Sequence, residues 1–186
     1  LISHKVCALL SRMSLDEKIG QMILCEHLSV SPQEVKEQHL GGVMSGSDPS
    51  PGSSTLAERV AMNDAYWAAS MSEDAQHLAI PVLIGTHAVH GNNNVRGATI
   101  FPHNIGLGAT NDPGLISRVA AVTAREILAA GAEWAFAPAL AVARNVCWGR
   151  TFESYSEDAQ TVTACGTAFV QGLQADLGTS SVIACA

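Results

Sequence analysis

The chain has 186 residues, of which 47% are hydrophobic and 15% charged, and it contains 16 glycines. This composition is typical of a packed α/β domain and excludes a disordered or fibrous chain. The formal net charge is −7 and there is no basic run, so we expect no nucleic-acid partner, because phosphate neutralisation needs clustered Lys and Arg. No apolar run approaches transmembrane length, and we expect no membrane association.

The five cysteines are widely spaced and form no CxxC pair, which argues against a zinc or redox motif. We expect them to be small buried side chains. The opening segment, LISHKVCALL, lacks the basic lead and the cleavage site of a signal peptide and fits an amphipathic helix. These features leave the cellular compartment and the oligomeric state open.

Helices and short strands alternate along the first half of the chain. A capping-box pattern at residues 14–17 opens a helix that leads into the apolar IGQMIL, and a second one opens a helix at residues 55–58. Between them a short helix in SPQEVKEQHL precedes a strand in GGVMS, and GSDPSPGSS is a loop by composition. The helical apolar faces predicted to meet the core are Val6, Leu9, Leu10 and Met13 in the first helix, and Leu56, Val60, Trp67 and Met71 after the second capping box.

The second half continues the same alternation. IPVLIG predicts a buried strand, and a long polar loop follows it. Asp112 and Pro113 predict the start of a helix that ends at Gly131. AEWAFAPALAV reads as a strand covered on both faces, because it is continuously apolar. A further helix opens at residues 156–158, and VIACA predicts a final strand.

This alternation predicts a parallel sheet with helical crossovers. An open doubly wound sheet and a (β/α)8 barrel are the two candidate architectures. No glycine-rich dinucleotide motif follows the first strand, which favours the barrel. About five strands can be counted, too few for a whole barrel. We therefore expect residues 1–186 to form an incomplete (β/α)8 TIM-type barrel. The chain would supply about the first half of the barrel, up to its first five strands.

Ligands of parallel α/β folds bind beyond the carboxyl ends of the strands. GTHAVHGNNN, FPHNIGLGATND and RNVCWGRTFESYSED are the polar segments that fall at or near such positions. A guanidinium beside an indole and carboxylates suits a hydroxyl-rich ligand, since the guanidinium donates to hydroxyls and an aromatic face covers the apolar side of a sugar. An ion-pair network that fastens a loop is the alternative. The side chains in question are Arg144, Trp148, Arg150, Glu153, Tyr155, Glu157 and Asp158.

Three histidines raise the question of a metal site. His87 and His90 are three residues apart, and His103 follows. The pair follows a strand rather than lying on a helix, and no recognised spacing supplies further ligands. We expect structural histidines and no metal, and a metal-binding protein is the weakest of the functional hypotheses.

Several strings resemble the family 3 glycoside hydrolases, and most closely their β-glucosidase and exo-β-glucanase branch. They cover nearly the whole chain in order: MSLDEKIGQM, IPVLIGTHAVHGNNNVRGATIFPHNIGLGAT, WAFAPALAVARNVCWGRTFESYSED and VIACA. The resemblance implies a (β/α)8 barrel followed by a second α/β domain. It also implies retaining hydrolysis of β-glucosides or β-glucan oligosaccharides from non-reducing ends, without a cofactor.

The same resemblance implies that this chain carries no catalytic residue. The nucleophilic Asp lies later in the family's barrel, and the acid/base Glu usually lies in the next domain. A sugar-binding Lys-His pair would directly follow a strand such as VIACA. We therefore expect a fragment that is inactive alone, with the remainder of the barrel and the second domain absent.

Two residues match the family's positions for binding the terminal sugar. Arg150, in the string WGR, corresponds to an arginine that binds sugar hydroxyls. An Asp is expected in a Gly-x-Asp-x-x-His-Gly string, but here His87 stands in its place. A carboxylate accepts from two hydroxyls, whereas a neutral imidazole offers one acceptor and one donor. The exchange costs roughly 1.5 to 3 kcal/mol of binding, and Arg150 would disfavour a protonated His87.

Other departures from the family pattern are Asn92, Asn145 and Cys147. Two main hypotheses follow from the sequence. One is a fragment of a β-glucosidase or exo-β-glucanase. The other is a non-catalytic sugar-binding or scaffold homologue of the same fold, which His87 in place of the carboxylate would explain.

Overall fold

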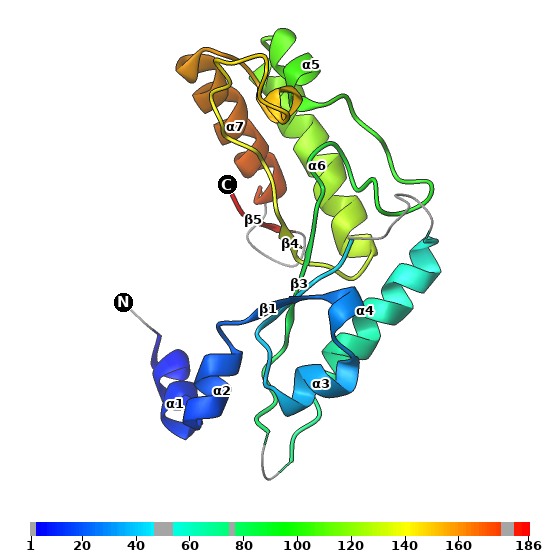
Figure 1. Cartoon of the computed structure of the whole chain (residues 1–186), viewed down its shortest axis with the longest axis vertical. Coiled ribbons are helices and arrows are strands. Elements are labelled where there is room, and N and C mark those ends of the chain that lie inside the picture. The colour runs from blue at the N-terminus through cyan, green and yellow to red at the C-terminus, as the bar shows by residue number, and fades with distance from the viewer. Residues whose placement is uncertain (1–2, 47–53, 75–76, 176–180) are drawn as a thin grey trace.

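The computed structural model describes residues 3–46, 54–74, 77–175 and 181–186. Helices and strands alternate along these residues (Figure 1). The helices are α1 (His4–Arg12), α2 (Leu15–Gly20), α3 (Pro32–Glu37), α4 (Leu56–Ser70), α5 (Asn104–Ala109), α6 (Pro113–Ala129) and α7 (Ala159–Leu173), with 3-10 turns η1 (His27–Ser29) and η2 (Thr151–Glu153). The strands are β1 (Leu24–Glu26), β2 (Gly42–Met44), β3 (Leu83–Thr86), β4 (Trp134–Ala135) and β5 (Ile183–Ala184).

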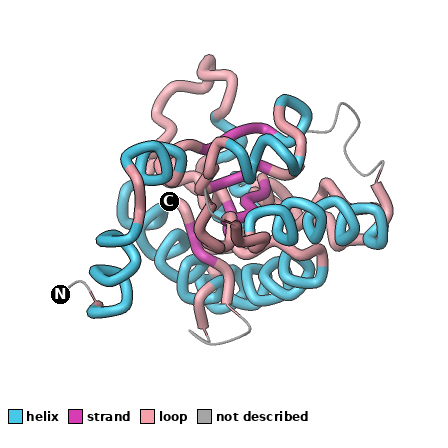
Figure 2. The backbone as a smooth tube through the Cα atoms, turned by 90° about the horizontal axis from the view of Figure 1, so that it is seen from below, coloured by secondary structure: helices cyan, strands magenta, loops and turns pink. Residues whose placement is uncertain are grey.

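The strands form one five-stranded sheet in the order β1-β2-β3-β4-β5, and all four neighbouring pairs are parallel. Helices connect successive strands, and Figure 2 shows the strands at the centre with the helices around them. Sequential parallel strands with helices outside are the arrangement of a (β/α)8 barrel. The sheet is that of an incomplete barrel, as the sequence predicts.

The two faces of the sheet differ in burial. Val43, Ile84 and Ala135 lie on the face covered by helices and are fully buried. Because side chains alternate across a strand, their neighbours point to the other face, which is concave in a barrel. On that face Leu24 is 43% exposed and Leu83 is 42% exposed. The concave face is therefore apolar but uncovered within the described residues.

Glycines make room for aromatic rings on this concave face. A Cβ atom on Gly85 would lie 2.7 Å from the Phe136 ring and 3.1 Å from the Trp134 ring. The two rings contact each other with centroids 4.5 Å apart. A larger residue at position 85 would displace these rings, which lie beside the carboxyl ends of the strands.

Helix starts follow the predicted capping signals. Ser14 and Thr55 form capping boxes with Glu17 and Glu58, in which each hydroxyl accepts from a backbone N–H and each carboxylate accepts from the backbone N–H of the cap. Asp112 caps α6, as predicted. The predicted start of the last helix at residues 156–158 is close, since α7 begins at Ala159 with Asp158 as its cap.

The prediction for the buried face of α4 was wrong in part, since Val60 and Met71 are partly buried but the other two residues are exposed. Leu56 and Trp67 are 44% and 48% exposed, and the residues buried on α4 are Arg59, Asn63, Tyr66 and Ser70. Arg59, Asn63 and Tyr66 hydrogen-bond to backbone carbonyls and loop hydroxyls, and Tyr66 also belongs to the hydrophobic core. The helical spacing of apolar residues in α4 could not predict this polar buried face, because the hydrogen-bond partners come from other segments of the chain. The predicted apolar face of α1 was also wrong in part: only Met13, its C-cap, is buried, while Val6 and Leu10 are exposed.

One strand, β1, was not predicted, and another, β4, is shorter than predicted. The apolar run after Ser14 does not stay helical: α2 ends at Gly20, and the chain then enters β1. In AEWAFAPALAV only Trp134–Ala135 is a strand. Pro138 has no backbone N–H to donate to a ladder, which limits the strand. A short helix, α5, forms within the segment predicted as a polar loop.

The cysteines are less buried than predicted. Cys165 is buried and Cys25 is partly buried, whereas Cys7, Cys147 and Cys185 are exposed, and all five are free thiols. Most of the loop predicted in GSDPSPGSS, residues 47–53, lies outside the described residues. No described helix is long and apolar enough to span a membrane.

Candidate functional site

The candidate site begins where β2 and β3 end. His87 directly follows β3, its side chain is exposed, and its Nε2 atom lies 3.2 Å from the Sδ atom of Met44 at the end of β2. The imidazole also contacts the ring of Phe136, which directly follows β4, with ring centroids 5.2 Å apart. His87 thus projects over the carboxyl ends of three adjacent strands, where a parallel α/β fold binds its ligand.

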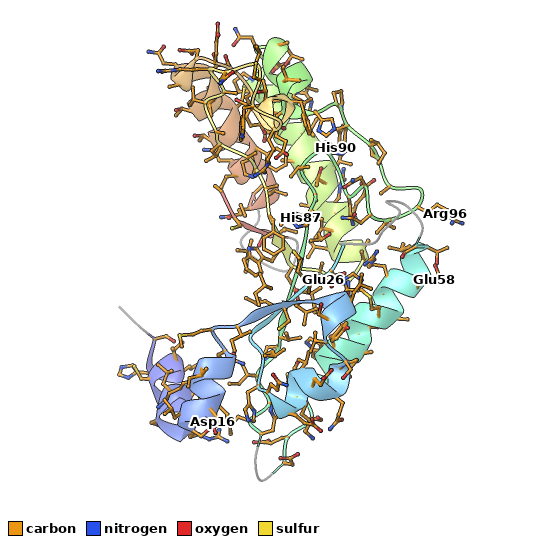
Figure 3. All side chains as sticks on the ribbon, in the orientation of Figure 1. Asp16, Glu26, Glu58, His87, His90 and Arg96 are labelled. Carbon is orange, nitrogen blue, oxygen red and sulfur yellow. The ribbon has the colours of Figure 1, made fainter. Side chains whose placement is uncertain are left out.

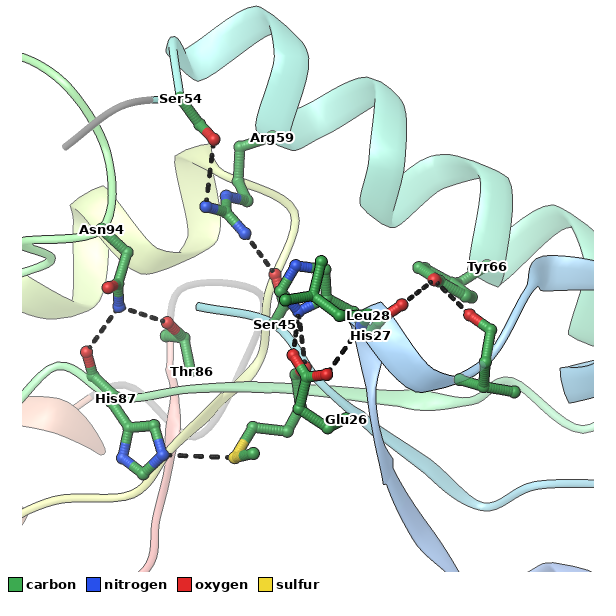
Figure 4. A network of polar contacts seen from close by, with 12 residues as sticks. Glu26, His27, Leu28, Ser45, Ser54, Arg59, Tyr66, Thr86, His87 and Asn94 are labelled. Atoms are coloured by element: carbon green, nitrogen blue, oxygen red, sulfur yellow. Dashed lines mark hydrogen bonds and ion pairs between the residues drawn. The ribbon is translucent and has the colours of Figure 1, made fainter. Parts of the chain in front are cut away.

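Hydrogen bonds from the same loop fix the backbone of His87. Asn94 donates through Nδ2 to the carbonyl oxygen of His87 at 2.8 Å, and the same nitrogen lies 3.3 Å from the Thr86 hydroxyl (Figure 4). Phe136 N–H donates to the carbonyl of Thr86 at 3.0 Å. The loop after β3 therefore fixes the position from which the imidazole extends.

The ends of β1 and β2 are joined by a second set of polar contacts. The Nδ1 atom of His27 lies 2.8 Å from Glu26 Oε1 and 3.2 Å from the carbonyl oxygen of Met44. Glu26 Oε2 accepts from Leu28 N–H at 2.8 Å. Figure 3 places Glu26 near His87 and far from Asp16 on α2. A carboxylate is thus anchored at the end of β1.

Helix α4 supports this region with its polar buried face. The Arg59 guanidinium donates to the hydroxyl of Ser45 at 3.2 Å and to that of Ser54 at 3.3 Å. The Tyr66 hydroxyl lies 2.9 Å from the carbonyl oxygen of His27 (Figure 4). These contacts fasten the segments after β1 and β2 to α4. They explain why α4 buries polar residues.

Arg150 lies in the long loop after β4 and forms a bidentate ion pair. Its Nε atom is 2.8 Å from Glu153 Oε1, and its Nη2 atom is 2.6 Å from Glu153 Oε2. The hydrogen bonds from Arg150 lower the pKa of the Glu153 carboxyl, and those to Glu153 raise the pKa of Arg150. Nearby His103 and His87 also lower the pKa of Glu153. The His103 ring, at the end of the loop after β3, contacts Phe152 in the loop after β4, so these two loops lie side by side.

Other predicted residues of this loop have structural contacts. Tyr155 is buried, and burial raises the pKa of its hydroxyl far above the ordinary value. Asp158 caps α7. Asn145 accepts from the backbone N–H of Cys147 at 2.9 Å, which forms a local turn. The Arg150–Glu153 ion pair agrees with the alternative of a loop-fastening network, and sugar binding by this segment stays a prediction.

The histidines are not gathered around a common centre. His90 lies 3.1 Å through Nδ1 from the carbonyl oxygen of Phe101, and its ring is 4.1 Å from that of His103 between centroids. The His103 ring contacts Phe152 edge-on at 4.7 Å. Burial and the nearby His90 charge lower the pKa of His103. Among the described residues, no three His, Cys, Asp or Glu side chains are placed to hold a metal ion.

Sequence reasoning missed three contributors to the site: Glu26, Met44 and Phe136. Glu26 was missed because β1 was not recognised, although the apolar ILC before it was the available signal. Met44 and Phe136 lie inside or beside predicted strands. Only the register, which sets Met44 opposite Gly85, brings them to His87.

Residues 14–186 match the model of the glycosyl hydrolase family 3 N-terminal domain. The chain belongs to this family. It is 32% identical to the lysosomal β-glucosidase of Dictyostelium discoideum over 89% of this chain and 22% of that protein. It is 29% identical to the periplasmic β-glucosidase of Salmonella typhimurium over 91% of this chain and 20% of that protein.

Solved structures of family 3 enzymes share the fold. The exo-1,3/1,4-β-glucanase ExoP of a Pseudoalteromonas species aligns with a TM-score of 0.90 and 39% identity, over 97% of this chain and 23% of that one. The β-glucosidase of Listeria innocua in complex with glucose aligns with a TM-score of 0.77 and 26% identity, over 99% and 26%. The chain thus spans less than a third of the length of these family 3 relatives.

Proposed function

We propose that residues 1–186 are the N-terminal portion of the barrel domain of a retaining β-glucosidase or exo-β-glucan hydrolase. The chain contributes part of the site for the terminal sugar. The remainder of the barrel and a second α/β domain belong to the same longer protein and supply the nucleophilic Asp and the acid/base Glu. The substrate is a β-glucoside or β-glucan oligosaccharide, cleaved from its non-reducing end.

One observation carries this proposal: the chain is 39% identical to an exo-1,3/1,4-β-glucanase in an alignment that covers 97% of the chain. The Listeria innocua β-glucosidase, which aligns over 99% of the chain, has been solved with glucose and, as a mutant, with laminaribiose. These relatives support a sugar ligand.

In this proposal Arg150 donates N–H groups to sugar hydroxyls from the loop after β4, and His87 meets the same sugar from the end of β3. An imidazole accepts fewer hydrogen bonds than a carboxylate, so His87 binds the sugar less tightly than an Asp would. Glu26 and Phe136, at the ends of β1 and β4, lie beside the sugar in this proposal.

The first test is the coding sequence that follows Ala186. We expect it to continue with a Lys-His pair and to supply the Asp and the Glu further on. A stop codon directly after Ala186 would overturn the enzyme proposal and favour a non-catalytic sugar-binding or scaffold homologue.

The second test is hydrolysis of an aryl-β-glucoside by the full-length protein that contains this chain. Arg150→Ala should lower kcat/KM by roughly ten- to a hundredfold, because a charged donor to the sugar is lost. His87→Asp should raise kcat/KM by roughly tenfold, because a charged acceptor is restored. Arg118→Ala, on the exposed side of α6, is the matched control and should leave the activity unchanged.

Absence of hydrolysis in both the parent and His87→Asp would exclude the enzyme and leave the sugar-binding homologue. Hydrolysis that responds equally to Arg150→Ala and Arg118→Ala would remove Arg150 from the sugar site.

A further inference from the structure

The Arg150–Glu153 pair is unequally exposed, although both residues lie in the same loop. The side chain of Glu153 is 14% exposed, whereas that of Arg150 is 64% exposed. The carboxylate is therefore fixed in the protein, and the guanidinium extends from it into solvent. This asymmetry is expected when one partner supports and the other presents a functional group.

Glu153 is itself held by its backbone. Its N–H donates to the carbonyl of Arg150 at 3.0 Å within η2. Its carbonyl accepts from Nδ2 of Asn104 at 2.8 Å, and Asn104 is 1% exposed at the start of α5. The loop containing η2 is thus fastened to a helix through a buried amide. Glu153 has little freedom to follow the guanidinium if that group moves.

The next residue fixes the same loop from its other side. Ser154 is 1% exposed, and its hydroxyl donates to the carbonyl of Ala141 at 2.6 Å. It also accepts from the N–H of Ala143 at 3.3 Å. η2 therefore lies between two anchored points, one on α5 and one on the segment that follows β4.

The geometry of the pair decides which donors of Arg150 remain. A guanidinium has five N–H groups. Glu153 accepts from Nε and Nη2, which form one edge of the group. The edge formed by Nη1 and Nη2 keeps two parallel N–H groups, a spacing that matches two neighbouring oxygen acceptors.

We infer that Glu153 and Asn104 are positioning residues for sugar binding: they hold Arg150 in one orientation, with its Nη1–Nη2 edge turned toward two adjacent hydroxyls of the sugar. This inference rests on the proposed function. Neither residue touches the sugar in this scheme, and both act through Arg150. An Arg150→Lys substitution cannot replace the function, because an ammonium has no such edge.

The first experiment measures orientation without any sugar. In the ¹⁵N-labelled full-length protein that contains this chain, the Nε–Hε signal of Arg150 should be visible at neutral pH because its hydrogen bond slows exchange. Glu153→Gln keeps the shape of the side chain but removes the charge, and hydrogen exchange at Nε should become roughly tenfold faster. Glu153→Asp, which keeps the charge but shortens the reach, should fall between the two.

The matched control is Glu73→Gln, which breaks an exposed ion pair to Arg12 far from the site. It should leave the Arg150 signal unchanged. Unchanged exchange at Arg150 Nε in both Glu153→Gln and Glu153→Asp would overturn the inference.

The second experiment uses the full-length protein and glucose as a competitive inhibitor of aryl-β-glucoside hydrolysis. Glu153→Gln should raise the inhibition constant of glucose by about tenfold. Combined with Arg150→Ala, it should cause no further loss beyond about twofold, because the two residues act as one unit. An equal loss in the presence and absence of Arg150 would show that Glu153 acts independently of it, which overturns the positioning role.

The two experiments separate this inference from the proposed function. A full-length protein without hydrolase activity would contradict the proposed function, while the Nε–Hε exchange still decides whether Glu153 orients Arg150. An active enzyme whose Glu153→Gln variant keeps both the slow exchange and the glucose affinity would contradict the positioning role alone.

Discussion

The candidate site consists of a few side chains at the carboxyl ends of the strands and in the loop after β4. His87 occupies the position where the family resemblance implies an Asp, and its imidazole contacts Met44 and Phe136. Arg150 is paired with a carboxylate that belongs to its own loop. The side chain at the end of β3 therefore differs from the one that the family pattern implies.

His103 is expected to make the stability of this region depend on pH. Burial and the nearby His90 charge lower its folded pKa, although Glu153 partly opposes this. An unfolded histidine titrates at about 6.5, so the unfolded state binds more protons between the two pKa values. The contribution of His103 to the free energy of unfolding is therefore fully present above about pH 6.5. It is lost as the pH falls toward the pKa of His103 in the folded state.

Urea denaturation at about pH 5.5 and about pH 7.5 tests this expectation. The parent chain should gain stability between the two conditions, and His103→Gln should gain less. The same gain in both proteins would contradict a lowered pKa at His103.

At the scale of elements, the loop after β3 has no helix or strand for much of its length and is held by specific contacts. Asn92 donates to the carbonyl of Glu126 on α6 at 3.2 Å, and the Glu126 carboxylate accepts from the hydroxyl of Thr99 at 2.8 Å. Phe101 N–H donates to the carbonyl of His90 at 2.9 Å. These contacts fasten a polar loop to a helix, which keeps its His87 end in place.

Two glycines of this loop provide a matched test. Gly91 and Gly97 both have positive φ angles, 93° and 88°. A Cβ atom on Gly91 would collide with the carbonyl oxygen of Thr99, whereas a Cβ atom on Gly97 would meet nothing within 4 Å. Gly97→Ala should cost about 1 kcal/mol from backbone strain alone, and Gly91→Ala more than about 2 kcal/mol.

Thermal or urea unfolding of the two variants gives the comparison. Equal losses would show that the close approach of Gly91 to Thr99 contributes nothing, and that only the backbone conformation matters.

For the molecule as a whole, the concave face of the sheet is an uncovered apolar surface among the described residues. Ile183 on β5 is 49% exposed and adds to Leu24 and Leu83 on the same face. In a closed barrel such side chains fill the interior in layers. An uncovered apolar face of this kind favours self-association.

We expect the isolated chain to self-associate through this face. Leu83→Glu, in the central strand, should lower the associated fraction several-fold because it buries a charge in the contact. Val146→Glu changes an apolar residue that is 89% exposed in the loop after β4 and serves as the control. Sedimentation velocity measures both. A parent chain that stays monomeric would contradict this expectation.

The sequence by itself determined the fold class, the family and most helix starts. Capping residues such as Ser14, Thr55 and Asp112 act on backbone groups within one turn, so a local pattern suffices to recognise them. The family strings likewise predicted His87 and Arg150 as candidate sugar-binding residues.

Only the tertiary structure decided which side chains meet. The polar buried face of α4, the short β4 and the contact of Met44 with His87 all depend on partners from distant segments. The same holds for Asn104, which supports Glu153 from 49 residues away. Such contacts arise from sheet register and helix packing, and the local spacing of apolar residues along the sequence predicts neither of them.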